Sequence, residues 1–115
     1  MIELPAIWPG IYQGEFRWLG IPDSISVQAT VDPSPRKLKI SLGNGPLRME
    51  GELEGHERNR DEFVGFLSMS SPYDDAPRTI AAIAKITYGG LYIFGWRFDI
   101  LLKPWAIHPP EVAKE

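Results

Sequence analysis

Apolar and polar residues alternate with a period of two along almost the whole chain, and glycine, proline and asparagine interrupt this alternation at short intervals. In residues 10–19, for example, Tyr12, Phe16 and Trp18 occupy even positions, and polar side chains occupy most of the odd ones. Successive side chains of a strand point to opposite faces of a sheet, so this pattern buries one face and exposes the other. The pattern predicts an all-β chain with little room for helix.

The interruptions divide the chain into seven predicted strands. They span about residues 10–19, 25–31, 36–42, 46–55, 62–70, 78–88 and 91–103. The segment 78–88 has a helical alternative because Ile80, Ile83 and Thr87 would lie on one helical stripe, but its β-branched residues favour a strand. Residues 2–4 are the candidate for an eighth strand.

Consecutive strands joined by turns, without crossover helices, predict an antiparallel up-and-down meander. Seven or eight such strands can close into a small β-barrel, which removes the exposed sheet edges. A two-sheet β-sandwich is the alternative, but glycines inside the strands favour the barrel because they let a closing sheet bend. The 115 residues then form one domain, with the barrel in residues 1–104 and an irregular, proline-containing tail in residues 105–115.

The turns of two hairpins predict how the strands that they join are paired. The Asn-Gly pair at residues 44–45 suits a type I′ turn, and with this pair at the centre Lys39 faces Glu50 and Lys37 faces Glu52.

For the last hairpin, we predict a three-residue bulged turn at residues 89–91. That turn places Ile86 opposite Phe94 and Ala82 opposite Phe98, so that the even positions of the last strand point inward.

Composition and charge narrow the function classes. The formal net charge of −3 lacks the basic surplus of a nucleic-acid-binding protein, so we expect no nucleic-acid partner. The absence of cysteine excludes disulfides, thiolate metal sites and a cysteine nucleophile. The N-terminal residues do not resemble a signal peptide, and no run approaches the roughly 20 apolar residues of a membrane-spanning helix. We therefore expect a cytoplasmic protein without a membrane partner.

Catalytic chemistry has no clear signature in the chain. His56 lies in a charged connection and His108 in the proline-rich tail, and both are more typical of solvated loop residues than of a catalytic pair. The adjacent carboxylates Asp74 and Asp75 are more typical of a turn than of a metal site. No phosphate loop, nucleophile elbow or zinc motif occurs. We predict no catalytic residue, metal site or cofactor, and an enzyme using carboxylates at a barrel mouth ranks as the third hypothesis.

The first function hypothesis is a non-catalytic protein that binds a small apolar ligand inside the barrel. An eight-stranded barrel has an interior just wide enough to be filled by side chains or to hold one small ligand. Aromatic rings with polar edges suit such a pocket, and the predicted lining residues are Tyr12, Trp18, Tyr92 and Trp96. The alternative reading of the same rings is a packed core.

The opening of the chain resembles that of calycin-type barrels, which include lipocalins, fatty-acid-binding proteins and avidins. In residues 8–16 a glycine, Gly10, is followed two positions later by an aromatic residue, Tyr12, as in the first strand of those families. The resemblance implies an up-and-down barrel with a ligand cavity at one mouth. It assigns none of those families' binding residues to a position in this chain.

The second function hypothesis is a protein-interaction or assembly module. Apolar residues remain on the predicted outer face of the last hairpin and in the tail, namely Ile83, Ile93, Leu101 and Trp105. Contiguous exposed apolar patches usually mark interfaces, so either the tail folds back over these residues or a partner subunit covers them, which favours a homodimer.

Overall fold

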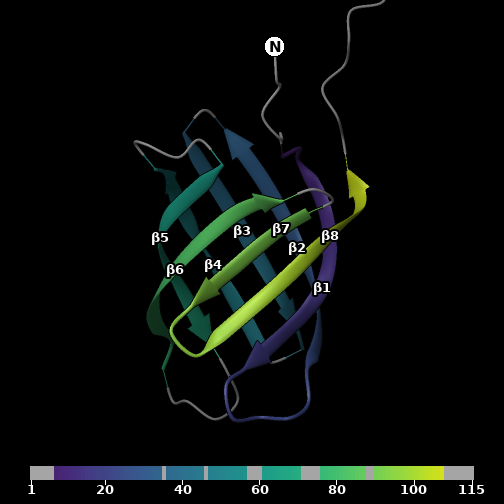
Figure 1. The fold of residues 1–115 in the computed structure, drawn as a ribbon, viewed down its shortest axis with the longest axis vertical. Helices are drawn as coiled ribbons and strands as arrows, with labels where there is room; N and C mark the ends of the chain where they lie inside the picture. Colours follow the sequence, from purple (N-terminus) through teal and green to yellow (C-terminus); the bar gives the residue numbers. More distant parts are fainter. Residues whose placement is uncertain are drawn as a thin grey trace, which may run out of the picture.

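The structure, a computed structural model, describes residues 7–34, 36–45, 47–56, 61–70, 76–87 and 90–107. Eight antiparallel strands follow one another around a closed barrel, in which β8 pairs with β1 (Figure 1). The strands are β1 (Gly10–Trp18), β2 (Ile25–Ser34), β3 (Lys37–Asn44), β4 (Leu47–Gly55), β5 (Glu62–Ser70), β6 (Arg78–Thr87), β7 (Gly90–Gly95) and β8 (Phe98–Ile107). The predicted all-β meander closing into a barrel is confirmed.

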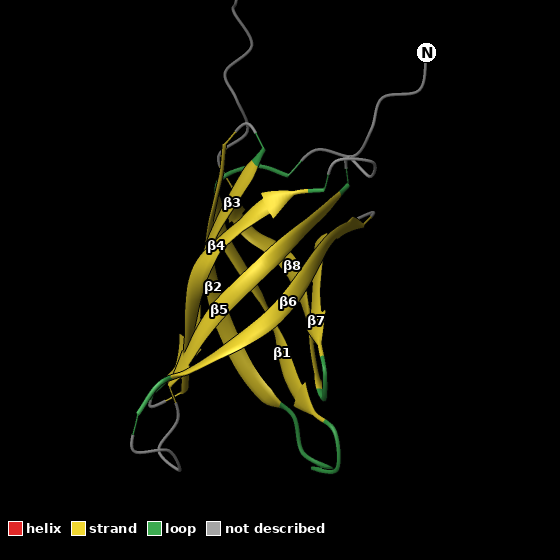
Figure 2. Cartoon of the chain, turned by 90° about the vertical axis from the view of Figure 1, so that its left-hand side faces the viewer, coloured by secondary structure: helices red, strands yellow, loops and turns green. Residues whose placement is uncertain are grey.

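The period-two pattern accounts for the core. Each strand turns one set of alternate side chains inward. Figure 2 shows the tilted strands arranged around the barrel axis. Side chains from all eight strands form one apolar cluster, with Leu38, Met49, Leu67 and Ile100 among its fully buried members. No buried polar or charged residue lies among the described residues.

The seam between β1 and β8 closes the barrel. A Cβ atom on Gly14 would collide with the backbone carbonyl oxygen of Leu101, so glycine allows the close approach of the two strands there. The register shifts between Ile11 and Tyr12, because Ile11 pairs with Ala106 whereas Tyr12 pairs with Pro104. Trp105 is therefore the extra residue of a bulge in β8.

The predicted strand 91–103 is instead a hairpin, and this is the main correction to the sequence analysis. β7 ends at Gly95, β8 begins at Phe98, and Trp96 and Arg97 form the turn, with Arg97 in the left-handed region at φ 79°. A two-residue turn reverses the chain without interrupting the period-two alternation, so the hydrophobic pattern does not mark the position of the turn. Ile93 consequently faces the interior with 0% exposure, and the prediction that it lies on the outer face is wrong.

Both predicted registers also need correction. In β3–β4, Lys39 faces Glu52 and Lys37 faces Glu54, which is a shift of two residues that leaves every side chain on its predicted face. The Nζ atom of Lys37 still lies 3.4 Å from Glu52, along the diagonal.

In β6–β7, Ile86 faces Leu91 and Ile83 faces Phe94, so Ile86 does not face Phe94 as predicted. The predicted turn at residues 89–91 is absent as such, because Gly90 and Leu91 already pair within β7. Residues 88–89, which connect the two strands, lie outside the described residues.

Two prolines that were expected to end strands lie within them. β2 continues through Pro33 to Ser34, and β8 continues through Pro104 to Ile107, which pairs with Gly10. The last strand thus extends four residues beyond its predicted end at residue 103. Residues 2–4, the predicted source of an eighth strand, and residues 108–115 lie outside the described residues, and the eighth strand arises from the division of residues 91–103.

Candidate functional site

Two of the four residues predicted to line a ligand pocket face the barrel interior, and they do so toward opposite ends of β1. The hydroxyl of Tyr12 donates a hydrogen bond of 2.8 Å to the carbonyl of Trp8, and burial raises the pKa of this phenol above its usual value. The Trp18 ring stacks with Phe16 and Phe98, with ring centroids 5.9–6.3 Å apart. These three rings pack as a layer at the end of the barrel where β1 ends.

The other two predicted lining residues do not face the interior. Tyr92 lies on the outer wall of β7, and Trp96 lies in the β7–β8 turn with 81% of its surface exposed. The division of the last predicted strand into a hairpin is the reason, because it reverses which positions of β7 point inward. The structure therefore does not bring the four predicted residues together.

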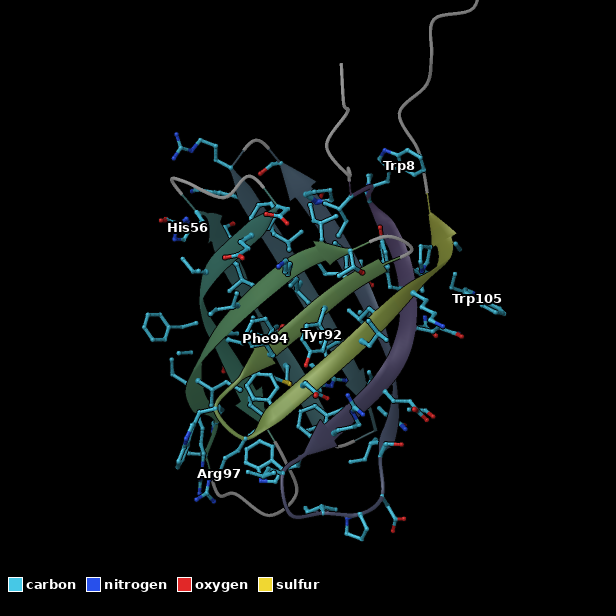
Figure 3. The ribbon with its side chains drawn as sticks, viewed as in Figure 1. Trp8, His56, Tyr92, Phe94, Arg97 and Trp105 are labelled. Carbon is cyan, nitrogen blue, oxygen red and sulfur yellow. The ribbon has the colours of Figure 1, made fainter. Side chains whose placement is uncertain are left out.

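The outer wall carries a different assembly of apolar side chains, which we call the outer aromatic face. It spans four adjacent strands, and its members are Val64 and Phe66 of β5, Ile83 of β6, Tyr92 and Phe94 of β7, and Leu101 of β8. Val64 pairs with Ile83, Ile83 with Phe94, and Tyr92 with Leu101. Tyr92 stacks on Phe94, and Phe66 follows Val64 by two positions on the same face of β5, so the six side chains lie on one side of the wall. Figure 3 labels Tyr92 and Phe94 on the part of the wall that faces the viewer.

The opposite half of the wall is polar. The outward positions of β2, β3 and β4 among the described residues carry no large apolar side chain. They include Gln28, Thr30, Asp32, Lys39, Ser41, Arg48, Glu50 and Glu52. Since a solvated sheet face normally has this composition, the apolar composition of the β5–β8 wall is what requires an explanation.

A polar network is built into the outer aromatic face. The guanidinium of Arg17 donates two hydrogen bonds to the Asp99 carboxylate, at 2.7 and 3.0 Å, and the Tyr92 hydroxyl donates a third at 3.1 Å. The Tyr92 ring also stacks on Phe94 at 5.1 Å. Burial, and then the hydrogen bond to the negative carboxylate, raise the pKa of Tyr92, while the same carboxylate raises the pKa of Arg17. These contacts hold the Tyr92 ring in one orientation on the surface.

Three of the four predicted interface residues lie on the outside of the barrel. Ile83 and Leu101 belong to the outer aromatic face, and Trp105 projects outward from the β8 bulge (Figure 3). Ile93 lies in the core. The sequence analysis missed Phe66, which is 64% exposed. β5 carries apolar residues at both its odd and its even positions, and this was a signal that some of them had to face outward.

Two hollows indent the outside of the wall. One, of about 340 Å³, lies beside the outer aromatic face and is lined by Gln13, Gly14, Glu15, Arg17, Leu101 and Lys103. The other, of about 350 Å³, lies on the polar half, near the β3–β4 turn. The first hollow gives the otherwise convex wall a recess at the Arg17 edge of the aromatic face.

The residues singled out as candidates for catalytic or metal chemistry are placed as follows. No group of three histidine, aspartate, glutamate or cysteine side chains in the described part of the chain could hold a metal ion. His56 follows β4, and its backbone N–H donates to the carbonyl of Glu62 at 2.9 Å. His108, Asp74 and Asp75 lie outside the described residues.

The chain matches no protein-family model, no curated protein and no solved structure. Within the described ranges, no helix has the length and apolarity needed to cross a membrane.

Proposed function

We propose that this protein is a non-catalytic assembly module that binds a second copy of itself through the outer aromatic face. The observation that carries the proposal is the unequal division of the wall: six apolar side chains lie side by side on β5–β8, whereas β2–β4 present polar side chains. Adjacent strands lie about 4.8 Å apart, so four of them give a face roughly 20 Å wide. That width matches the apolar core of a standard interface, which buries roughly 800 Å² per partner.

The composition of the face supports protein association. Phenylalanine and tyrosine are enriched at the centres of protein interfaces, where they bury a large area with few rotatable bonds. Asp99 and Arg17 fix the Tyr92 ring before any partner arrives, which lowers the entropy lost on binding. The barrel is closed, so it has no free strand edge to offer, and a partner must contact the wall itself.

The charges around the face favour a like copy as the partner. Arg17 is paired with Asp99, and the Nζ atom of Lys85 lies 4.0 Å from Glu62. Both of these positive groups therefore have a negative neighbour, which reduces the repulsion between like charges when two identical faces approach about a two-fold axis.

Sedimentation analysis of a charge variant tests the proposal. Phe66→Glu places a carboxylate at the most exposed side chain of the face, on β5, so we expect the wild type to form a concentration-dependent dimer and this variant to remain monomeric. Thr30→Glu is the matched control, because it adds the same charge at an exposed position of β2 on the polar half of the wall. A wild-type chain that is monomeric at high micromolar concentration would refute the proposal, and so would equal dissociation of both variants.

A small apolar ligand inside a calycin-like barrel is the second candidate function, and the inward positions of Tyr12 and Trp18 support it. Its expected signature is saturable binding of an apolar fluorophore that persists in Phe66→Glu, because that substitution alters only the outer wall. Loss of fluorophore binding in Phe66→Glu would assign the site to the outer aromatic face and count against an interior ligand.

A further inference from the structure

A second apolar surface lies at one end of the barrel, separate from the outer aromatic face. We call it the apolar tip, and it consists of Leu19, Ile21 and Ile25 at the β1–β2 connection and Trp96 at the β7–β8 turn. Leu19 and Trp96 are 73% and 81% exposed, which is far more than a core residue at the edge of a barrel would be. These residues are four of the eight large apolar side chains that are exposed in the described part of the chain.

The two loops of the tip are held together. The backbone N–H of Leu19 donates to the carbonyl of Arg97 at 2.7 Å, and the N–H of Ile21 donates to the carbonyl of Trp18 at 3.0 Å. Beneath them, the stacked rings of Phe16, Trp18 and Phe98 fill the end of the barrel. The tip side chains are therefore not needed to cover the core, and they project from a base that is already packed.

The chemistry of the tip combines apolar groups with a cation. The guanidinium of Arg97 lies 4.2 Å from the centroid of the Trp96 ring. Tryptophan concentrates at the boundary between lipid headgroups and acyl chains, and arginine there can reach the phosphates while its side chain stays along an apolar surface. Among the described residues, three further arginines lie at this end of the barrel: Arg17 near the end of β1, Arg48 near the start of β4 and Arg78 at the start of β6.

We propose that the apolar tip binds the surface of a phospholipid bilayer by inserting Leu19, Ile21 and Trp96 to the depth of the headgroups. The exposed apolar side chains of the tip and the Arg97 guanidinium over the Trp96 ring match the apolar and charged layers that meet at a bilayer surface. Two of the tip's backbone donors, on Leu19 and Ile21, already have acceptors within the chain, which reduces the penalty of leaving water. The expectation of no membrane partner rested on the lack of a spanning segment, which binding at a surface does not require.

Flotation with vesicles tests this proposal. We expect the wild-type chain to float with mixed phosphatidylcholine and phosphatidylglycerol vesicles, and the double variant Leu19→Ser, Ile21→Ser to partition at least tenfold more weakly. Phe66→Glu is the control, because its position lies on the outer wall, away from the tip. We expect it to lose self-association and keep vesicle binding, whereas the tip variant keeps self-association, so the two proposals fail separately.

Tryptophan emission gives a second readout that does not depend on partition strength alone. Insertion of the tip should shift the emission to shorter wavelength on addition of vesicles, and Trp96→Leu should remove most of that shift while the variant still floats. A wild-type chain that does not float, or a tip variant that floats as well as the wild type, would overturn the proposal.

Discussion

Replacing Ile93 by alanine should destabilise the monomer by about 3 kcal/mol, because the structure places this side chain in the barrel core with 0% exposure. The truncation removes three carbon atoms, which contribute about 2.4 kcal/mol at about 0.8 kcal/mol each. The cavity left among the packed neighbours adds to this loss, and isoleucine-to-alanine changes in cores typically cost about 2–5 kcal/mol in total.

Leu101→Ala is the matched comparison, because Leu101 lies on the adjacent strand but points outward and is 44% exposed. Only part of its side chain leaves water on folding, so we expect a loss of about 1 kcal/mol or less. The two substitutions remove similar volumes from neighbouring strands, and the difference between them measures the direction in which each side chain points.

Urea denaturation followed by circular dichroism provides the measurement. With an m-value of about 2 kcal/mol/M, the midpoint of Ile93→Ala should fall by roughly 1.5 M and that of Leu101→Ala by less than about 0.5 M. Both should be measured at two protein concentrations, because dimerisation would add a concentration-dependent contribution to the stability. Equal losses for the two variants, or a larger loss for Leu101→Ala, would refute the assignment of faces in the last hairpin.

The packing, the seam and the surface network each give a further prediction. Ala84→Leu should destabilise the barrel by about 1–3 kcal/mol in the same denaturation assay if the interior is filled, whereas unchanged stability would indicate an open interior. Gly14→Ala should destabilise it by more than about 2 kcal/mol, because the new methyl group collides with the Leu101 carbonyl at the seam, and a neutral result would place the seam elsewhere. Absorbance titration should show the Tyr92 phenol ionising above its usual pKa of 10.0, and this upward shift should be smaller in Asp99→Asn. The folding stability that the raised pKa provides is present below pH 10 and is lost as the pH rises through the folded-state pKa.

The sequence contained enough information to identify the architecture. The period-two alternation, the short turns and the absence of crossover helices are local properties, and together they predict an antiparallel meander that closes into a barrel. The faces of the first six strands follow from the same alternation. Even the incorrect register of β3–β4 kept each side chain on its proper face, because a shift of two residues preserves parity.

The candidate site was harder to predict, because it depends on the direction of one short segment. Residues 91–94 are apolar at both parities, so the alternation alone cannot say which side chains of β7 point inward. The turn at Trp96 and Arg97 carries no glycine, proline or asparagine to mark it, and its left-handed residue is an arginine. Missing this turn inverted β7 and assigned Ile93 to the surface, while Tyr92 and Trp96 were assigned to a pocket.

By itself, then, the sequence determined the class of fold, the strand count to within one strand, and the polar outer face of β3 and β4. Each of these depends on contacts between residues close in sequence. Only the tertiary structure decided where β7 turns into β8, and with it the membership of the outer aromatic face and the apolar tip. Both surfaces assemble side chains from strands or loops distant in sequence. Which of the two alternating sets of apolar side chains of β7 enters the core depends on the space that the other seven strands leave. That space is a property of the closed barrel.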